Sequence, residues 1–362
     1  MFWKGGSDLA HLRFGIIGAG GIAHAHARAL RGLPDTALLV GAADAVPEAA
    51  QKFGAEFGIT TYGGDRAVEQ LLNRDDIDAV SIATPSGLHA SLAIAALESG
   101  RHVLCEKPLG ITLEQVDAMI AVQTRSGKAL GCVYQQRLHP SAQIVKQAIA
   151  DGRFGRILHA NSYLKWQRTQ AYYDAGGWRG TWAMDGGGAL MNQSIHYIDL
   201  LQWLAGPLAT LHAYTGTLNH RIETEDAAVA VVRFQSGALG TIEGMTNAIA
   251  GTYDRVEIYG TLGAAVIEGG QLVRYYTAAE ATPPTPENPR PNTNLAEAAL
   301  SAFASAHPNL PTGHKAVFST FINAILDGKE PPVTGQEARK AIEIILGIYR
   351  AGREGAEVRF GG

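Results

Sequence analysis

The first third of the chain alternates short apolar runs with longer segments whose apolar residues recur at helical spacing. The apolar runs are predicted strands: Arg13–Gly18, Leu38–Ala43, Ala79–Ala83, His102–Cys105 and Ala129–Tyr134. The segments between them, such as Leu88–Glu98 and Leu113–Gln123, are predicted helices. Strands that are apolar along their whole length are buried on both faces. The alternation therefore predicts an α/β unit with a parallel, doubly wound sheet.

The pattern changes after about residue 135, where several runs alternate apolar with polar positions. The predicted strands there are Arg156–Trp166, Ala227–Phe234, Ala238–Met245, Val256–Tyr259, Ala264–Glu268 and Val358–Phe360. The predicted helices are Ser141–Ala150, Ala189–Leu204, Gly313–Leu326 and Gly335–Gly352. Alternating strands joined by short turns indicate an antiparallel sheet, so the second part is predicted to be α+β with a large open, mostly antiparallel sheet. Five prolines predict a surface loop over Ala281–Pro291.

Composition narrows the function classes. The chain of 362 residues has a formal charge of −4, which gives no reason to expect nucleic acid as a partner. No run of 18 apolar residues occurs, and residues 1–11 lack the layout of a signal peptide, so no membrane partner is predicted and these residues form a flexible extension. Cys105 and Cys132 lie in apolar runs, and buried thiols in a reducing cytoplasm are favoured over a disulfide. No metal site is predicted.

A dinucleotide-binding motif follows the first predicted strand. Gly18-Ala19-Gly20-Gly21-Ile22-Ala23 fits G-x-G-x-x-A, in which the glycines make the tight turn and let a pyrophosphate approach the helix N-terminus. Asp44 ends the next strand 24 residues beyond Gly20, where an acidic group binds the adenosine ribose. The alternative is that these residues bind no cofactor and are only a glycine-rich turn and a solvent-exposed aspartate. The carboxylate and the absence of arginine in Ala45-Val46-Pro47 favour NAD over NADP.

With this motif the chain resembles the glucose–fructose oxidoreductase, inositol dehydrogenase and rhizopine-catabolism (Gfo/Idh/MocA) family. The other stretches that carry the resemblance are Thr84-Pro85 with His89, Glu106-Lys107-Pro108, Gln136-Arg137-Leu138-His139-Pro140, and a glycine-rich lead into a helix with His196. The resemblance implies a Rossmann domain over 12–134 and a substrate-binding and oligomerisation domain over 135–362. It also implies a homodimer or homotetramer formed through the open sheet.

The cofactor and the hydride-transfer centre are expected at the carboxyl ends of the first sheet, where open parallel sheets bind ligands. The predicted cofactor-binding residues are Gly18, Gly20, Gly21, Ile22, Asp44, Ala83, Thr84, Pro85, His89, Glu106, Lys107 and Gln135. Lys107 is expected beside the nicotinamide, where an ammonium group can hydrogen-bond the substrate oxygen and share its proton. The alternative is a surface lysine before a proline turn.

Three polar residues share the predicted helix Ala189–Leu204 at spacings i, i+4 and i+7: Asn192, His196 and Asp199. An imidazole suits removal of a hydroxyl proton as hydride departs, so His196 is a candidate base. Asn192 stands where the family more usually has aspartate, and an amide cannot act as a base. The predicted catalytic residues are thus Lys107, His196 and Asn192. Asp199 either orients the imidazole or lies behind it.

Aromatic residues and arginines gather in the turn-rich segment Arg168–Thr181. Aromatic faces pack on sugar rings and arginines bind hydroxyls or a carboxylate, although an oligomer contact has the same composition. The predicted substrate-binding residues are Lys107, Arg168, Tyr172, Trp178, Arg179, Asn192 and His196.

The sequence therefore predicts a cytoplasmic, NAD-dependent oxidoreductase that acts on a secondary alcohol or ketone of a sugar, sugar acid or cyclitol. Two other functions stay open. One is a glycoside-cleaving enzyme that oxidises the ring transiently, and the other is a non-catalytic protein that senses NAD(P). Lys107 and His196 argue against the sensor, which has no need of them.

Overall fold

The computed structural model describes residues 11–252, 254–280, 285 and 293–361. The predicted extension 1–11 and the predicted loop Ala281–Pro291 thus lie almost wholly outside the described residues. The chain divides into two compact units. Unit 1 comprises Met1–Leu109, Glu114–Val133 and Pro311–Gln336, and unit 2 comprises Gly110–Leu113, Tyr134–Leu310 and Glu337–Gly362.

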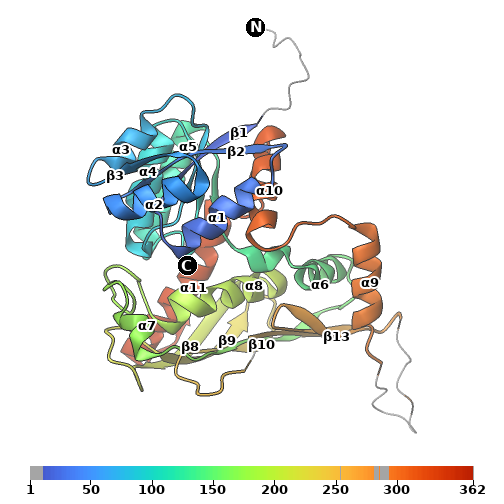
Figure 1. Ribbon diagram of the computed structural model, residues 1–362. Helices are drawn as coiled ribbons and strands as arrows, with labels where there is room; N and C mark the ends of the chain where they lie inside the picture. Colours follow the sequence, from blue (N-terminus) through green and yellow to red (C-terminus); the bar gives the residue numbers. More distant parts are fainter. Residues whose placement is uncertain (1–10, 253, 281–284, 286–292, 362) are drawn as a thin grey trace. The chain divides into compact units, whose positions relative to one another are not determined.

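Unit 1 contains a parallel sheet of six strands in the order β3-β2-β1-β4-β5-β6. The strands are β1 (Leu12–Ile17), β2 (Ala37–Asp44), β3 (Thr60–Gly63), β4 (Ala79–Ile82), β5 (His102–Cys105) and β6 (Leu130–Cys132). The helices are α1 (Gly21–Arg31), α2 (Pro47–Phe57), α3 (Ala67–Leu72), α4 (His89–Glu98), α5 (Leu113–Ser126) and α10 (Gly313–Leu326) (Figure 1). The predicted doubly wound parallel sheet is confirmed. Strand β3 was not predicted, because Thr60-Thr61-Tyr62-Gly63 is a short polar edge strand without an apolar run.

Helix α10 belongs to unit 1, although the sequence assigned it to the second part of the chain. Its Phe318 and Phe321 rings pack against Phe14 of β1, with ring centroids 5.7 and 6.5 Å apart. A Cβ atom on Gly131 of β6 would lie 2.8 Å from the Phe321 ring, so this glycine makes room for the helix. These buried rings make α10 part of the hydrophobic core of unit 1. The contacts join residues about 300 positions apart in the sequence, so no local sequence pattern predicts them.

Unit 2 contains a sheet of eight strands in the order β13-β12-β11-β7-β10-β9-β8-β14. The strands are β7 (Ile157–Lys165), β8 (Leu208–Gly216), β9 (Ala227–Phe234), β10 (Leu239–Met245), β11 (Arg255–Gly260), β12 (Gly263–Glu268), β13 (Gln271–Thr277) and β14 (Val358–Arg359). Neighbours are antiparallel except β7 and β10, which confirms the predicted mostly antiparallel sheet. Strands β8 and β13 were not predicted because their alternation is weak.

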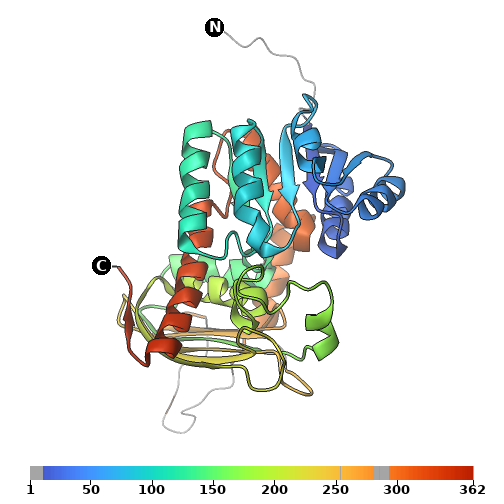
Figure 2. The ribbon, with the colours of Figure 1, turned by 90° about the vertical axis from the view of Figure 1, so that its left-hand side faces the viewer.

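Helices cover one face of this sheet (Figures 1 and 2). The helices of unit 2 are α6 (Pro140–Ala150), α7 (Gln170–Asp174), α8 (Ile195–Ala205) and α9 (Ala296–Ala306), and α11 (Gly335–Glu354) begins in unit 1 and continues in unit 2. Helix α9 was not predicted. Among the described helices, none has both the length and the apolar character needed to cross a bilayer.

The predicted helix Ala189–Leu204 is two elements. Residues Ala189–Ser194 form a π-helix, here η3, and the α-helical turns begin at Ile195. Backbone and side-chain oxygens of Glu225 accept the N–H groups that open η3, so a distant residue fixes its start. Of the three polar residues predicted to share one helix face, Asn192 lies in the wider π turn, whereas His196 and Asp199 lie in α8. Single π turns occur often at functional sites.

Candidate active site

Four strands of unit 1 end side by side at one edge of its sheet. Ile17 of β1 is in register with Ala43 of β2 and with Ile82 of β4, and Ile82 pairs with Cys105 of β5. The predicted residues at the ends of these strands consequently lie along one edge: Asp44 is the last residue of β2, and Gly18, Ala83 and Glu106 follow β1, β4 and β5. This edge is where an open parallel sheet binds its ligand.

The glycine turn between β1 and α1 is shaped for a close backbone approach. Gly18 has a φ of +102°, and a Cβ atom there would lie 2.5 Å from the carbonyl oxygen of Ala83. Gly20 and Gly21 differ, since in the described part of the chain, apart from the adjoining residues and the helix's own backbone, no atom lies within 4 Å of the Cβ position at either residue. The N-terminus of α1 therefore opens onto free space, with Ile22 38% exposed beside it. Backbone N–H groups and the helix dipole at such an end fit the pyrophosphate of NAD.

The two glycines should respond differently to alanine. We expect Gly18→Ala to destabilise the fold by about 1–3 kcal/mol, because the new methyl group clashes with Ala83 at a positive φ. Gly20→Ala meets no protein atom and is expected to leave the melting temperature unchanged while weakening NAD binding. Thermal unfolding and cofactor titration of both variants measure this. If Gly20→Ala bound NAD with the affinity of the wild type, the prediction that this turn binds the pyrophosphate would be wrong.

Asp44 holds the turn from the next strand. Its Oδ2 accepts the Ala19 N–H at 2.7 Å and its Oδ1 accepts the Val46 N–H at 2.8 Å. An ionised carboxylate offers about four acceptor positions, so these two bonds leave acceptors for ribose hydroxyls. Asp44 ends β2, as the sequence analysis expected, and pairs there with Gly63 of β3.

His89 connects two loops at the same edge. The ring is fully buried, its Nδ1 lies 2.7 Å from the Pro108 carbonyl oxygen, and its Nε2 lies 2.9 Å from that of Thr84. Burial lowers the pKa of His89, against the hydrogen bonds to these carbonyls. His89 therefore joins the Thr84-Pro85 loop to the turn that follows Lys107. Lys107 itself is partly exposed and precedes a cis proline peptide.

Glu106, predicted to bind cofactor, is buried with its carboxylate turned to the protein interior. Its Oε1 lies 2.9 Å from His26 Nε2, and its Oε2 accepts the Lys107 N–H at 3.1 Å. Although burial acts to raise it, hydrogen bonds from His26 and His314 hold the pKa of Glu106 well below its ordinary value. An anionic Glu106 therefore fixes the backbone of Lys107.

In unit 2, Asn192 has a carboxylate neighbour that the sequence analysis missed. Asn192 Nδ2 donates to Asp185 Oδ1 at 2.7 Å, and the Gly180 N–H donates to Asp185 Oδ2 at 2.9 Å. Asp185 is only 1% exposed. It precedes the triple glycine Gly186–Gly188 by one residue, which is the only local signal that could have found it.

His196 and Asp199 lie one turn further along, in α8. The half-buried His196 ring meets Tyr134 edge-on, with centroids 6.0 Å apart. Both carboxylate oxygens of Asp199 accept from Arg137, at 2.6 and 2.7 Å, and both of these side chains are buried. Asp199 is thus paired with Arg137. This pairing favours the second alternative, in which Asp199 lies behind the His196 imidazole and does not orient it directly. Burial, opposed by Arg137, raises the pKa of Asp199.

The predicted arginines and aromatics form one stack in unit 2. Arg168 lies over the rings of Trp166 (5.0 Å) and Tyr172 (5.2 Å). Arg179 lies over Tyr172 (4.8 Å) and Trp178 (4.9 Å). The Tyr172 hydroxyl accepts from Gln193 Nε2 at 3.0 Å, so the stack reaches the residue next to Asn192.

The remaining predicted residues fall in different units. Lys107 belongs to unit 1, whereas Gln135, Asn192 and His196 belong to unit 2. Gln135 opens a short 3-10 helix, Gln135–Leu138, and within the described residues its buried Oε1 has no hydrogen-bond partner. A buried amide oxygen of this kind suits a hydrogen bond from a ligand.

Glu225 is a second buried carboxylate that sequence reasoning missed. It accepts the N–H groups of Gly188 (2.9 Å) and Leu190 (2.8 Å) and the hydroxyl of Tyr349 (2.9 Å). Burial raises the pKa of Glu225 to about 7. Its partners are 35 to 124 residues away, so no sequence spacing points to them.

We expect this carboxyl to make stability fall as the pH rises. Between its ordinary pKa of 4.5 and about 7, the folded protein holds a proton that the unfolded chain releases. The free energy of unfolding then drops by about 3 kcal/mol across this window. Glu225→Gln cannot titrate and should flatten the profile, whereas Glu223→Gln, at an exposed position nearby, should not. Melting temperatures from about pH 4 to pH 8 measure both; equal slopes in wild type and Glu225→Gln would contradict the assignment.

Family comparisons cover most of the chain. Residues 12–134 match the oxidoreductase family with an NAD-binding Rossmann fold, and residues 142–266 match the GFO/IDH/MocA C-terminal domain. Levoglucosan dehydrogenase of Pseudarthrobacter phenanthrenivorans is 30% identical over 291 residues, which cover 71% of this chain and 74% of that protein. Inositol 2-dehydrogenase of Rhizobium meliloti is 29% identical over 267 residues, or 72% of this chain and 77% of the relative.

A solved structure is similar over nearly the whole length. The WlbA dehydrogenase of Bordetella pertussis, in complex with NADH and UDP-GlcNAcA, has a TM-score of 0.87 and 34% sequence identity. The match covers 98% of this chain and 99% of that one.

Proposed function

Because this chain belongs to the Gfo/Idh/MocA family of NAD-binding oxidoreductases, we propose that it transfers a hydride between NAD and a secondary alcohol or ketone of a sugar, sugar acid or cyclitol. The observation that carries the proposal is the glycine turn open at the N-terminus of α1, on the sheet edge that also holds Lys107. Levoglucosan dehydrogenase and inositol 2-dehydrogenase, both relatives, are named for a sugar derivative and a cyclitol.

Two groups of this chain are proposed to handle the hydroxyl proton. Lys107 binds the substrate oxygen, and His196 accepts the proton as the carbonyl forms. Asn192, held by the buried Asp185, orients the substrate by hydrogen bonding. When bound, NAD supplies the acceptor for the hydride. Lys107 and His196 also argue against a protein that only senses NAD(P), because such a protein needs no group that transfers a proton.

Within the proposed substrate class we favour a sugar acid. Arg168 and Arg179 are stacked on aromatic rings, an arrangement that holds guanidinium groups ready for a carboxylate while the rings pack on a sugar. The similar WlbA dehydrogenase was solved with UDP-GlcNAcA, which supports the same choice. NAD is favoured over NADP, since Asp44 would repel a 2′-phosphate and the residues after it offer no arginine.

We further propose a cytoplasmic homodimer or homotetramer formed through the sheet of unit 2. The face away from α6, α8 and α9 carries exposed apolar side chains, among them Tyr214 (77% exposed) and Val231 (59%) on neighbouring strands. Exposed apolar patches are normally covered by a partner. Cys105 and Cys132 are both buried, which is compatible with a reducing location. Light scattering at micromolar concentration should give a dimer or tetramer, and a monomer would refute the interface.

A substrate screen tests the enzymatic proposal. Purified protein is incubated with NAD, and in parallel with NADP, against a panel of sugars, sugar acids, cyclitols and UDP-GlcNAcA, and NADH formation is followed by absorbance. We expect turnover with NAD on at least one sugar-like alcohol, strongest among the acids. The dehydrogenase is contradicted if NAD binds but no member of the panel reduces it and no corresponding ketone oxidises NADH in the reverse direction.

A further inference from the structure

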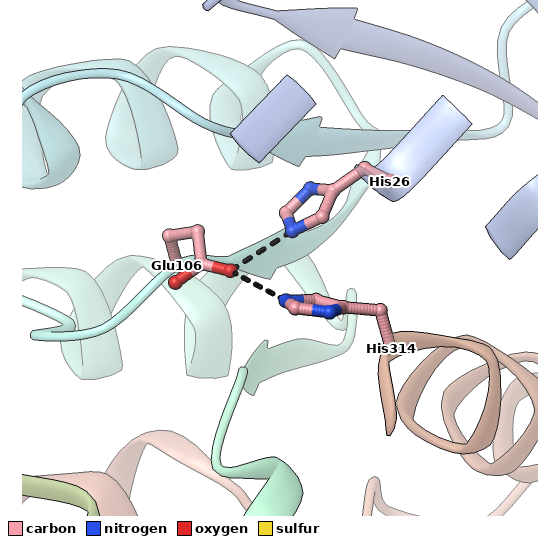
Figure 3. Close-up of side chains that lie close together, drawn as sticks. All are labelled: His26, Glu106 and His314. Atoms are coloured by element: carbon pink, nitrogen blue, oxygen red, sulfur yellow. Dashed lines mark hydrogen bonds and ion pairs between the residues drawn. The ribbon is translucent and has the colours of Figure 1, made fainter. Parts of the chain in front are cut away.

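Three segments of unit 1 bring a carboxylate between two imidazoles (Figure 3). His26 lies on α1, Glu106 follows β5, and His314 lies in the first turn of α10. The Nε2 atoms of both histidines point to the same oxygen, Glu106 Oε1, at 2.9 Å from His26 and 3.5 Å from His314. One ligand atom from each residue lies within 4.8 Å of the others.

These separations are compatible with metal ligands. Tetrahedral Zn²⁺ binds nitrogen and oxygen at about 2.0–2.1 Å, which places its ligand atoms about 3.4 Å apart. The two observed distances, 2.9 and 3.5 Å, bracket this value. As a hydrogen bond, the 3.5 Å contact from His314 is longer than the usual range of about 2.7–3.2 Å.

The surroundings also resemble those of a metal site. The second ring nitrogen of His26, Nδ1, is 2.8 Å from Ser81 Oγ, and metal-binding histidines are commonly oriented by such a contact. The second oxygen of Glu106 accepts the Lys107 N–H, which fixes the carboxylate. His26 is 0% and Glu106 6% exposed, whereas the His314 side chain is 24% exposed. An ion could therefore enter from the His314 side and keep a water there.

We propose that His26, Glu106 and His314 bind one transition-metal ion of the Zn²⁺ type, with a solvent ligand on the His314 side. The donor set of two imidazoles and a carboxylate is one that Zn²⁺ accepts. The ion would clamp α1, the end of β5 and α10 together. Its role is structural, and no step of the hydride transfer proposed above passes through the ion, although Glu106 also fixes the backbone of Lys107.

The same helix offers an internal comparison. His24 pairs with Glu56, 3.2 Å away, on the more exposed side of α1. This pair has a histidine and a carboxylate, as the proposed site does, and it does not belong to the described cluster of three ligands. His24→Ala is therefore the matched control for loss of a histidine from α1.

The test measures metal bound to the full-length protein. The protein is stripped with a chelator, dialysed against metal-free buffer and titrated with Zn²⁺, and with Co²⁺ as a spectroscopic probe. We expect one ion per chain, the intense visible absorption of four-coordinate Co²⁺, and a higher melting temperature with metal. Glu106→Gln and His314→Ala should each weaken binding by at least about 100-fold, and His24→Ala should not.

Other outcomes overturn the site. Substoichiometric Zn²⁺ in the wild type, or equal affinity in wild type and His314→Ala, would show that the three residues form only a hydrogen-bonded cluster. His314→Gln, which keeps the length of the side chain, serves if the alanine variant does not fold. Circular dichroism and thermal unfolding in metal-free buffer check the fold of each variant. Metal affinity is measured without NAD or substrate, so a failure of this site is separable from a failure of the proposed dehydrogenase.

Discussion

Replacing Lys107 or His196 with alanine is expected to lower turnover by about 10²–10⁴-fold while NAD affinity stays near that of the wild type. The hydroxyl proton must leave as the carbonyl forms, and these two groups are the ones proposed to bind the oxygen and take the proton. Single-turnover reduction of NAD, together with cofactor titration, separates the two effects. Near-normal turnover in both variants would show that the acid–base roles are assigned wrongly.

Asn192 provides the graded comparison for that experiment. Asn192→Ala should cost less than either of those variants, because the amide orients and does not transfer a proton. Asn192→Asp introduces the aspartate expected from the family resemblance, but it would place a carboxylate about where the Asn192 amide now lies, 2.7 Å from the buried Asp185. Two carboxylates this close cannot both ionise, so one would hold a proton. We expect this variant to lose activity as the pH rises, with a profile that the wild type lacks.

Removing Asp199 is expected to destabilise the protein by about 3–5 kcal/mol. Arg137 is 3% exposed and would lose both of its bonds to Asp199, while its bond to the partly exposed Glu337, at 3.0 Å, stays. A buried charge that has lost its buried partner costs more than the pair contributes, so the paired replacement Arg137→Met with Asp199→Leu should cost much less than Asp199→Ala. Urea unfolding of the variants measures the difference.

A surface ion pair gives the matched control for this result. Arg66 and Glu69 are in contact at 2.9 Å but exposed to 75% and 54%. Arg66→Ala should leave stability unchanged, because solvent screens the pair. If Arg66→Ala and Asp199→Ala lowered the free energy of unfolding equally, burial could not be the reason that breaking the Arg137–Asp199 pair is costly.

The periodicity of the chain was a good guide to the elements with strong patterns. The continuous apolar runs of unit 1 and the alternation in Ala227–Phe234 reflect burial on two faces or one, so their strands could be predicted. Strand β3 is short and polar, and β8 alternates weakly, so neither carries such a signal. The return of α10 to unit 1 depends on contacts with Phe14, which a local pattern does not encode.

The candidate site divides in the same way. Gly18, Gly20 and Asp44 could be proposed from the sequence because the turn motif and strand ends are local features. Asp185, Glu225 and the His26–Glu106–His314 cluster could not, because each depends on partners brought together by the fold. The π-helix also escaped prediction, since hydrogen bonds to Glu225 rather than local preference open it.

The central claim, net oxidation of a sugar-like alcohol by NAD, is tested most directly by the ratio of NADH formed to substrate consumed over many turnovers. The measurement uses the best substrate from the screen, with product identified by mass spectrometry. We predict one NADH for each substrate molecule and a product two hydrogens lighter. Cleavage of a glycoside with NAD unchanged at the end would contradict the dehydrogenase and favour transient ring oxidation followed by elimination.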